Sequence, residues 1–197
     1  MKKIFFILSM FTLLILLSFS YSNAVMQDFN RNIIRLHIIA QSNSDYDQKI
    51  KLDVRNEILK AVKDTDIKDT EKFLYLAEKA ANSYLTKNNI AYSAKAVSGS
   101  FYFPEKTYNN ITLPSGKYNG IRVILGTGNG ENWWCIMYPP LCVTDSGEIN
   151  ADKNTALKLK SSLSPDTYEL ITDNSRKIKV KFKTVEFFNR LKELSEK

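Results

Sequence analysis

Histidine and cysteine are scarce in this chain of 197 residues, which has one histidine and two cysteines. A zinc site needs three or four ligands, and His and Cys residues clustered at zinc spacing are absent. A catalytic triad would have to be built around the single histidine, His37. The composition therefore predicts no metal centre and no bound cofactor.

Glycine is also rare, with seven residues, and its one dense cluster does not fit a phosphate-binding loop. Gly126, Gly128 and Gly130 depart by one residue from the spacing of a dinucleotide-binding motif. A strand-like run follows them, whereas a phosphate site needs the N-terminus of a helix. Asn129-Gly130 between two strand-like runs instead predicts a β-hairpin turn.

Charge is absent from Ile4 to Phe19, an apolar run that follows Lys2 and Lys3. With the small residues Ser22-Asn23-Ala24 after it, this pattern predicts a signal peptide over residues 1–24, cleaved after Ala24. The run is shorter than the roughly 20 residues of a spanning helix. The alternative is an uncleaved anchor, because Phe19 to Tyr21 could extend the run. Either way, the remainder lies outside the cytoplasm.

Residues 25–197 show no repeat or low-complexity tract and have the length of a single domain. The net charge is +7, of which Lys2 and Lys3 supply two charges. A moderately basic exported chain suits an anionic membrane surface, a cell-wall polymer or an acidic protein partner. Nucleic acid is not an expected partner outside the cell, and no small-molecule substrate is evident.

The hydrophobic periodicity predicts an α+β fold. We expect a mostly antiparallel sheet, with two N-terminal helices packed on one face and a C-terminal strand followed by a helix. Ser44 with Asp47 resembles a capping box, and Thr70 is the expected cap of the second helix. The secondary structure of the polar segment 143–175 is ambiguous from the sequence, apart from a helix expected at 151–163. The expected strands are 33–40, 91–97, 100–103, 118–125, 133–138 and 178–185; the other helices are 44–63, 70–84 and 185–194.

His37 lies in the first strand-like run, where alternation places it on the same face as Arg35. A Cys–His dyad with Cys135 or Cys142 is one interpretation, because the partners need only meet in space. The commoner situation is a histidine that is hydrogen-bonded at a sheet edge or core boundary. Geometry distinguishes the two, since a dyad needs a thiol within hydrogen-bond reach of the imidazole.

Cys135 and Cys142 are the only cysteines, and an even number in an exported chain indicates a disulfide. An extended chain would separate them by about 23 Å. The chain must therefore reverse between them, and Pro139-Pro140 stands where it could. The alternative is two buried thiols that act as small hydrophobic groups.

Two further groups are candidates for a binding surface. Trp133 and Trp134 are adjacent, so on a strand they face opposite sides, and the one outside the core is a potential binding anchor. Lys177, Lys179, Lys181 and Lys183 alternate with apolar residues, which on a strand gives a row of four ammonium groups. Such a row is typical of a protected edge strand, or of a docking site for anionic lipid or protein. Arg35 and Arg122 add cations on predicted strands.

Two segments resemble the stage II sporulation protein R family. The first is Ile34-Arg35-Leu36-His37-Ile38-Ile39-Ala40-Gln41-Ser42-Asn43-Ser44 with Asp47-Gln48 and Lys51-Leu52-Asp53-Val54-Arg55. The second is Ile121-Arg122-Val123, Gly126, Gly128, Asn132-Trp133-Trp134-Cys135 and Pro139-Pro140-Leu141-Cys142. Lys179 to Lys183 with Val185-Glu186 is similar to the family's C-terminal end.

This resemblance implies a function that composition could not. Members of the family are exported from the forespore into the space between the forespore and mother-cell membranes. There they trigger a membrane-bound peptidase that processes pro-sigma-E. No catalytic residues are implied, so we expect a ligand that acts by binding. The alternative is an exported hydrolase that uses His37 with a cysteine on the peptidase or the cell wall.

Overall fold

The computed structural model describes residues 2–63, 65, 69–108, 111–138, 153–173 and 176–195. Its internal contacts divide the chain into two compact units. The sheet unit is Ile33–Phe101 with Asn119–Thr155. The anchor unit is Met1–Asn32, Tyr102–Tyr118 and Ala156–Lys197. Helices and strands occur in both, which confirms the predicted α+β class.

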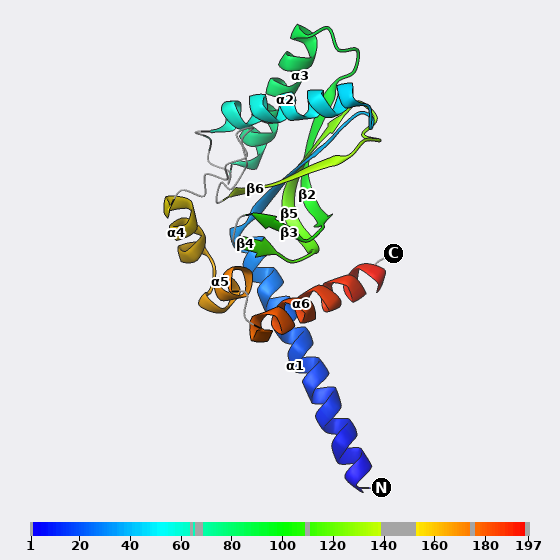
Figure 1. Cartoon of the computed structure of the whole chain (residues 1–197), viewed down its shortest axis with the longest axis vertical. Coiled ribbons are helices and arrows are strands. Elements are labelled where there is room, and N and C mark those ends of the chain that lie inside the picture. Colours follow the sequence, from blue (N-terminus) through cyan, green and yellow to red (C-terminus); the bar gives the residue numbers. More distant parts are fainter. Residues whose placement is uncertain are drawn as a thin grey trace. The chain divides into compact units, whose positions relative to one another are not determined.

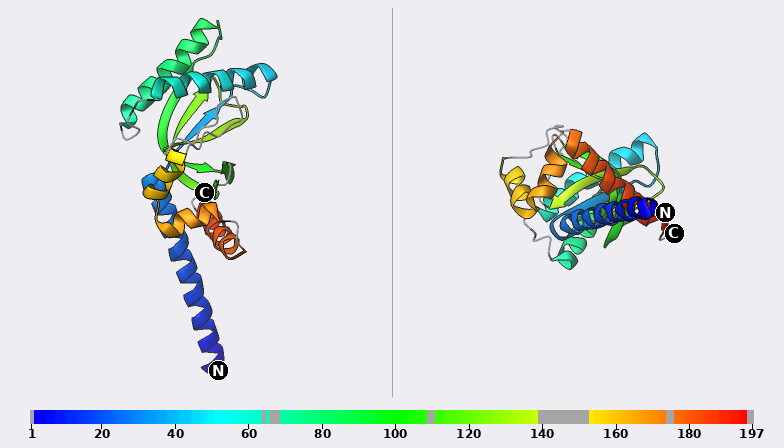
Figure 2. Two further views of the ribbon diagram at one scale, coloured as in Figure 1. Left: turned by 60° about the vertical axis from the view of Figure 1, so that its left-hand side comes forward. Right: turned by 90° about the horizontal axis from the view of Figure 1, so that it is seen from below.

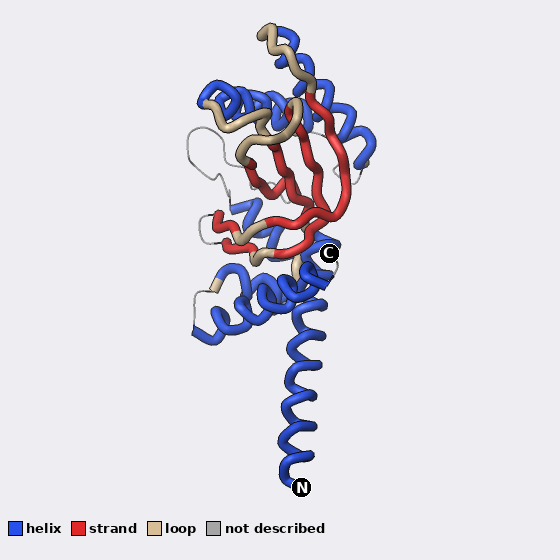
Figure 3. The backbone as a smooth tube through the Cα atoms, turned by 90° about the vertical axis from the view of Figure 1, so that its right-hand side faces the viewer, coloured by secondary structure: helices blue, strands red, loops and turns tan. Residues whose placement is uncertain are grey.

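The sheet unit contains most of a four-stranded sheet with the order β2-β5-β1-β6 (Figure 3). The strands are β1 (Ile34–Ile39), β2 (Ala94–Phe103), β5 (Gly116–Leu125) and β6 (Asn132–Tyr138). β1 pairs in parallel with β5 and antiparallel with β6. The strand nearest the N-terminus is therefore central and is flanked by strands from much later in the chain.

Two helices, α2 (Asp45–Val62) and α3 (Thr70–Lys87), cover one face of this sheet (Figures 1 and 2). Ser44 caps α2 as predicted, since its side chain accepts a hydrogen bond from the backbone N–H of Asp47. The cap of α3 is Asp69 rather than the predicted Thr70. The core between the helices and the sheet includes Leu36, Ile38, Val54, Ile58, Phe73, Ala77, Ala81, Ile121, Val123, Leu125 and Cys135.

Two predicted turns are wrong. Asn129-Gly130 does not close a hairpin, because β1 lies between β5 and β6 and the loop must cross the end of β1. Ser98-Gly99, the turn signal between the strands expected at 91–97 and 100–103, does not separate two strands, because β2 runs without a break from Ala94 to Phe103. Both dipeptides are local turn signals that longer-range strand pairing overrides.

The anchor unit combines helices with a small pair of strands. β3 (Lys106–Tyr108) and β4 (Ile111–Leu113) pair antiparallel. The helices are α1 (Lys2–Asn32), α4 (Lys153–Ser162), α5 (Pro165–Thr172) and α6 (Arg176–Ser195), of which the start of α4 belongs to the sheet unit. Phe29 of α1 is fully buried, and its ring centroid lies 5.8 Å from that of Tyr118. The predicted helix at 151–163 is confirmed over the residues of α4.

The strand predicted over residues 178–185 is wrong, because α6 includes this whole segment. Positions two residues apart share a face on a strand but not on a helix. Lys177, Lys179, Lys181 and Lys183 therefore do not form the predicted single row. The alternation that suggested a strand is compatible with either structure until packing selects one.

α1 is long and apolar enough to cross a membrane, and the apolar window of the helix is fully exposed. This is compatible with a signal sequence and with export. The helix continues without a break through Ala24 to Asn32. Whether the predicted cleavage after Ala24 takes place stays a prediction.

Candidate functional site

The sheet face that α2 and α3 leave uncovered carries a row of four side chains, one from each strand. In strand order these are Phe101 of β2, Arg122 of β5, His37 of β1 and Trp134 of β6. His37 is in register with Arg122 on one side and with Trp134 on the other. Residues in register on neighbouring strands point to the same face, so the sheet itself assembles this set. We call it the cross-strand row.

Stacking contacts hold the members of the cross-strand row together in pairs. The imidazole of His37 stacks on the indole of Trp134, with 3.7 Å between ring centroids. The guanidinium carbon of Arg122 lies 4.1 Å from the ring centroid of Phe101. Planar groups in such contacts contribute roughly 0.5–2 kcal/mol each, depending on desolvation. The row is therefore a preformed surface of flat side chains.

His37 is buried within the row and is neutral at physiological pH. Burial lowers its pKa to about 4; the hydrogen bond with Asn132 opposes this, while the nearby positive charges of Arg122 and Arg35 add to it. Its Nε2 atom lies 2.7 Å from the amide oxygen of Asn132, which can only accept, so Nε2 is the donor. Asn132 thereby fixes the tautomer and the plane of the ring.

Arg35 and Arg122 place two permanent cations on this face. Arg35 is fully buried and lies two residues before His37 on β1, as the predicted alternation required. Arg122 is half-buried, and its Nε atom has no hydrogen-bond partner among the described residues. Burial lowers the pKa of Arg122, but an arginine remains charged at physiological pH. Arg122, rather than the fully buried Arg35, is therefore the cation of this face that is suited to meet a carboxylate or another anionic group.

The geometry does not assemble a His37–Cys135 dyad. Cys135 is in register with Leu36, so its side chain points into the core beneath the helices, on the opposite face from His37. Cys135 is also disulfide-bonded, which leaves no thiol to activate. Cys142 lies outside the described residues, so its predicted pairing with Cys135 and a dyad with His37 both stay untested predictions. Among the described residues, no group of His, Cys, Asp or Glu could hold a metal ion.

The other predicted binding residues lie elsewhere. Trp133 packs against the core on the helix-covered face, where the guanidinium of Arg55 lies 5.1 Å from its ring. The side chains of Lys179 and Lys181 lie outside the described part of the chain. Sequence reasoning missed Phe101 and Asn132, although Asn132 stands two residues before Trp134 and so shares its face on a strand.

A second set of polar contacts fastens the end of β1. The loop 126–131 crosses residues 40–43, where the N–H of Gly130 donates to the carbonyl of Ala40 and that of Glu131 to the side chain of Asn43. A Cβ added to Gly130 would lie 2.3 Å from the carbonyl oxygen of Ser42, so only glycine fits there. We call this crossing the loop clasp.

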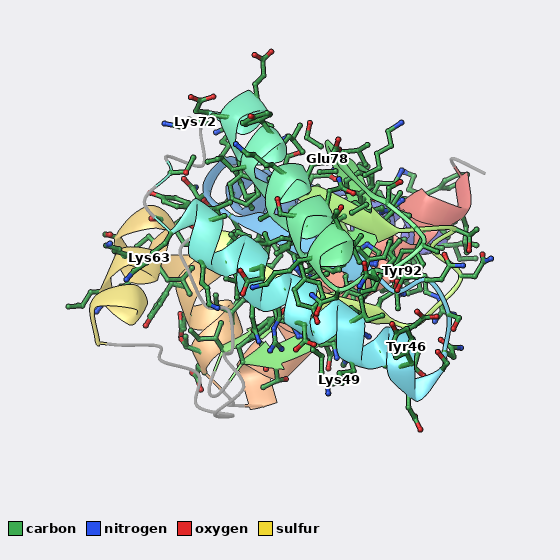
Figure 4. The ribbon with its side chains drawn as sticks, turned by 90° about the horizontal axis from the view of Figure 1, so that it is seen from above. Tyr46, Lys49, Lys63, Lys72, Glu78 and Tyr92 are labelled. Atoms are coloured by element: carbon green, nitrogen blue, oxygen red, sulfur yellow. The ribbon has the colours of Figure 1, made fainter. Side chains whose placement is uncertain are left out.

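Two charged side chains of α2 and the hydroxyl groups of Ser42 and Tyr92 complete the loop clasp. Lys51 donates to the carbonyl of Glu131, and Asp47 accepts from Ser42 and from Tyr92. The hydrogen bond from Ser42, reinforced by Tyr92, lowers the pKa of Asp47 despite its burial. Figure 4 shows Tyr92 near this end of α2. Each of these groups already has a protein partner, which indicates a structural role.

Comparison with known proteins places these features in one family. Residues 30–148 match the family described as stage II sporulation protein R. A protein of Bacillus subtilis (strain 168) named "Stage II sporulation protein R" is 36% identical over an alignment of 129 residues, and the match covers 61% of this chain and 58% of the relative. The match thus spans little more than half of that relative's length, and no solved structure matches the chain. The family match covers more than half of the chain, including both the cross-strand row and the loop clasp, so the chain belongs to the stage II sporulation protein R family.

Proposed function

We propose that this protein is an exported messenger of endospore formation that activates, by binding, the membrane-bound peptidase that processes pro-sigma-E in the mother cell. It works in the space between the forespore and mother-cell membranes. Membership of the family is the observation that carries the proposal, since it supports a role in sporulation. The exposed apolar part of α1 is compatible with the export that this role requires.

The cross-strand row is the surface that we propose for receptor contact. Aromatic and arginine side chains dominate the binding energy of protein interfaces, and this row supplies Trp134, Phe101 and Arg122 in fixed positions. His37 is held by Asn132 and Trp134, and its pKa of about 4 makes it a weak base, which suits a supporting group better than a general base for hydrolysis. The proposed receptor feature is an acidic or amide-rich segment that meets Arg122 and Trp134.

Reconstitution of the full chain with the membrane peptidase and its precursor substrate tests this function. The measurement is the dose–response of precursor processing for wild type, Trp134→Ala and Trp133→Ala. Truncation of a binding anchor typically reduces affinity about thirtyfold, so Trp134→Ala should need about thirty times more protein to reach an unchanged maximum. Trp133→Ala is the matched control, because it removes the adjacent indole from the opposite face and should lower stability rather than affinity.

The same assay distinguishes a ligand from an enzyme. His37→Gln retains an N–H that can reach Asn132 but cannot act as a base. A ligand with this substitution still reaches full processing at high concentration. If folded His37→Gln binds the receptor normally yet gives no processing at saturation, the protein acts as an enzyme and the proposal is wrong. Failure of the wild-type chain to stimulate processing at any concentration would also contradict it.

A further inference from the structure

The anchor unit contains a second exposed apolar feature, which lies on α6. α1 carries the exposed apolar window, and the apolar run in its sequence ends at Phe19. α6 packs against α1 at the end of this apolar run. The ring centroids of Phe19 and Phe188 lie 5.7 Å apart, and the hydroxyl of Ser22 donates to the carbonyl of Val185. Figures 1 and 2 show α6 crossing α1 there. When α1 is in a bilayer, α6 is therefore level with the membrane surface.

α6 exposes an apolar stripe along one side. Phe187, Leu191 and Leu194 are 59%, 46% and 62% exposed, and their spacing of four and three residues places them on one helix face. On the opposite face, Val185 is fully buried and Asn189 donates to the carbonyl of Ser115. The stripe therefore points away from the folded body of the anchor unit.

The stripe is joined to α1 through aromatic rings. Phe187 lies 5.4 Å from Phe188 between ring centroids, and Phe188 contacts Phe19. The exposed side of α6 is thus continuous with the apolar surface of α1 rather than an isolated patch. Exposed apolar surface of this kind is stabilised when it is covered, and lipid is the nearest apolar phase to α1.

The charge of α6 favours one kind of lipid. Its sequence has seven Lys or Arg residues against two glutamates. A helix with an apolar stripe and many basic residues is typical of helices that lie in the interface of an anionic bilayer. We propose that α6 is an interfacial helix that docks Phe187, Leu191 and Leu194 onto an anionic lipid surface at the outer end of α1. This docking fixes the anchor unit of the uncleaved chain against the membrane, and it does not depend on peptidase activation.

Quenching by brominated lipid tests this docking in the full chain. The chain is reconstituted into phosphatidylcholine vesicles containing dibrominated lipid, with or without about 30% phosphatidylglycerol. Leu191→Trp reports contact with the acyl region, and Tyr75→Trp, at an exposed position of α3, is the matched control. The emission of wild type, which contains Trp133 and Trp134, is subtracted from both. α1 keeps every variant in the vesicles, so the signal reports α6 alone.

Quenching of Leu191→Trp in vesicles with phosphatidylglycerol should be at least about threefold stronger than quenching of Tyr75→Trp. It should fall to the control level when Phe187 and Leu194 are both replaced by serine, and it should weaken without phosphatidylglycerol. Equal quenching at the two reporter positions would overturn the docking. Quenching that survives the double serine substitution would overturn the role of the stripe, and equal quenching in both lipid mixtures would overturn the preference for anionic lipid.

Discussion

His37 should make the stability of this protein depend on pH in a window where few other groups titrate. Its pKa is about 4 in the folded chain, against an ordinary value of 6.5. Between these values the unfolded chain binds a proton and the folded chain does not. The free energy of unfolding is therefore highest above pH 6.5 and falls as the pH decreases toward 4. With these two pKa values, the loss from pH 7 to pH 5 is about 2 kcal/mol.

This loss is measurable because His37 is the only histidine. For a chain of this size, about 2 kcal/mol corresponds to a decrease in Tm of roughly 4–8 °C. The assay is thermal unfolding of the full chain in a non-ionic detergent at several values between pH 7 and pH 5. A single imidazole signal in the NMR spectrum gives the pKa of the folded state directly.

His37→Gln is the control, because it keeps an N–H for Asn132 and cannot titrate. Its Tm at pH 7 should be lower than that of wild type, since the stacking on Trp134 is weakened, but its decrease between pH 7 and pH 5 should be small. Equal pH slopes for the two proteins, or an imidazole that titrates near pH 6.5, would refute the burial of a neutral His37 in the cross-strand row.

Three further predictions concern the contacts of Gly130, the two cysteines and the N-terminus of the exported protein. Gly130→Ala should reduce the free energy of unfolding by about 3 kcal/mol, because the new Cβ would strike a backbone carbonyl. The Cβ of Gly99→Ala meets only the edge of a side-chain ring, so this variant should change the free energy of unfolding by less than about 1 kcal/mol. Denaturant titration of the two variants gives both values. Similar losses of stability in the two glycine variants would contradict the role of Gly130 in the loop clasp. If Cys142 is the partner to which Cys135 is bonded, each Ser variant should lose about 2.5 kcal/mol and the double variant little more. Thiol labelling after denaturation without reductant should then be negligible, and strong labelling would contradict this pairing. If residues 1–24 are a cleaved signal peptide, mass spectrometry of the exported protein should give Val25 as the N-terminus; finding only the full-length chain would show the uncleaved anchor on which α6 packs through Phe19 and Ser22.

Local sequence signals predicted most of the sheet unit. The apolar run of β1, the Ser44 cap and the helical spacing of α2 all act within a few residues, so one short segment determines each of them. Alternation also placed Arg35 with His37 and separated Trp133 from Trp134. The face on which each tryptophan lies could not be predicted, because it depends on which side of the sheet the helices cover.

The failures share a physical cause, which is pairing between distant segments. Asn129-Gly130 has the sequence of a hairpin turn, but β1 lies between the two strands that it was expected to join. The alternating lysines of 177–183 satisfy a period of two, yet their segment is helical, with Val185 and Asn189 of the same helix packed on the body of the anchor unit. The cross-strand row brings residues of four strands together, so sequence alone could name Arg122 and His37 without showing that they are neighbours.

The central position of β1 has a consequence for the order of folding. β1 is the first strand along the chain, but both of its partners lie far downstream: Arg35 pairs with Gly120, and Ile38 pairs with Trp133. A chain that crosses a membrane with its N-terminal part first delivers β1 long before β5 and β6, so the ladder with β5 must wait for residues 120–124 and the ladder with β6 for residues 132–138. Contacts of such high sequence separation form slowly because the intervening loop must close first. During any such transport, the topology leaves β1 unpaired and the sheet incomplete until more than half of the chain has emerged.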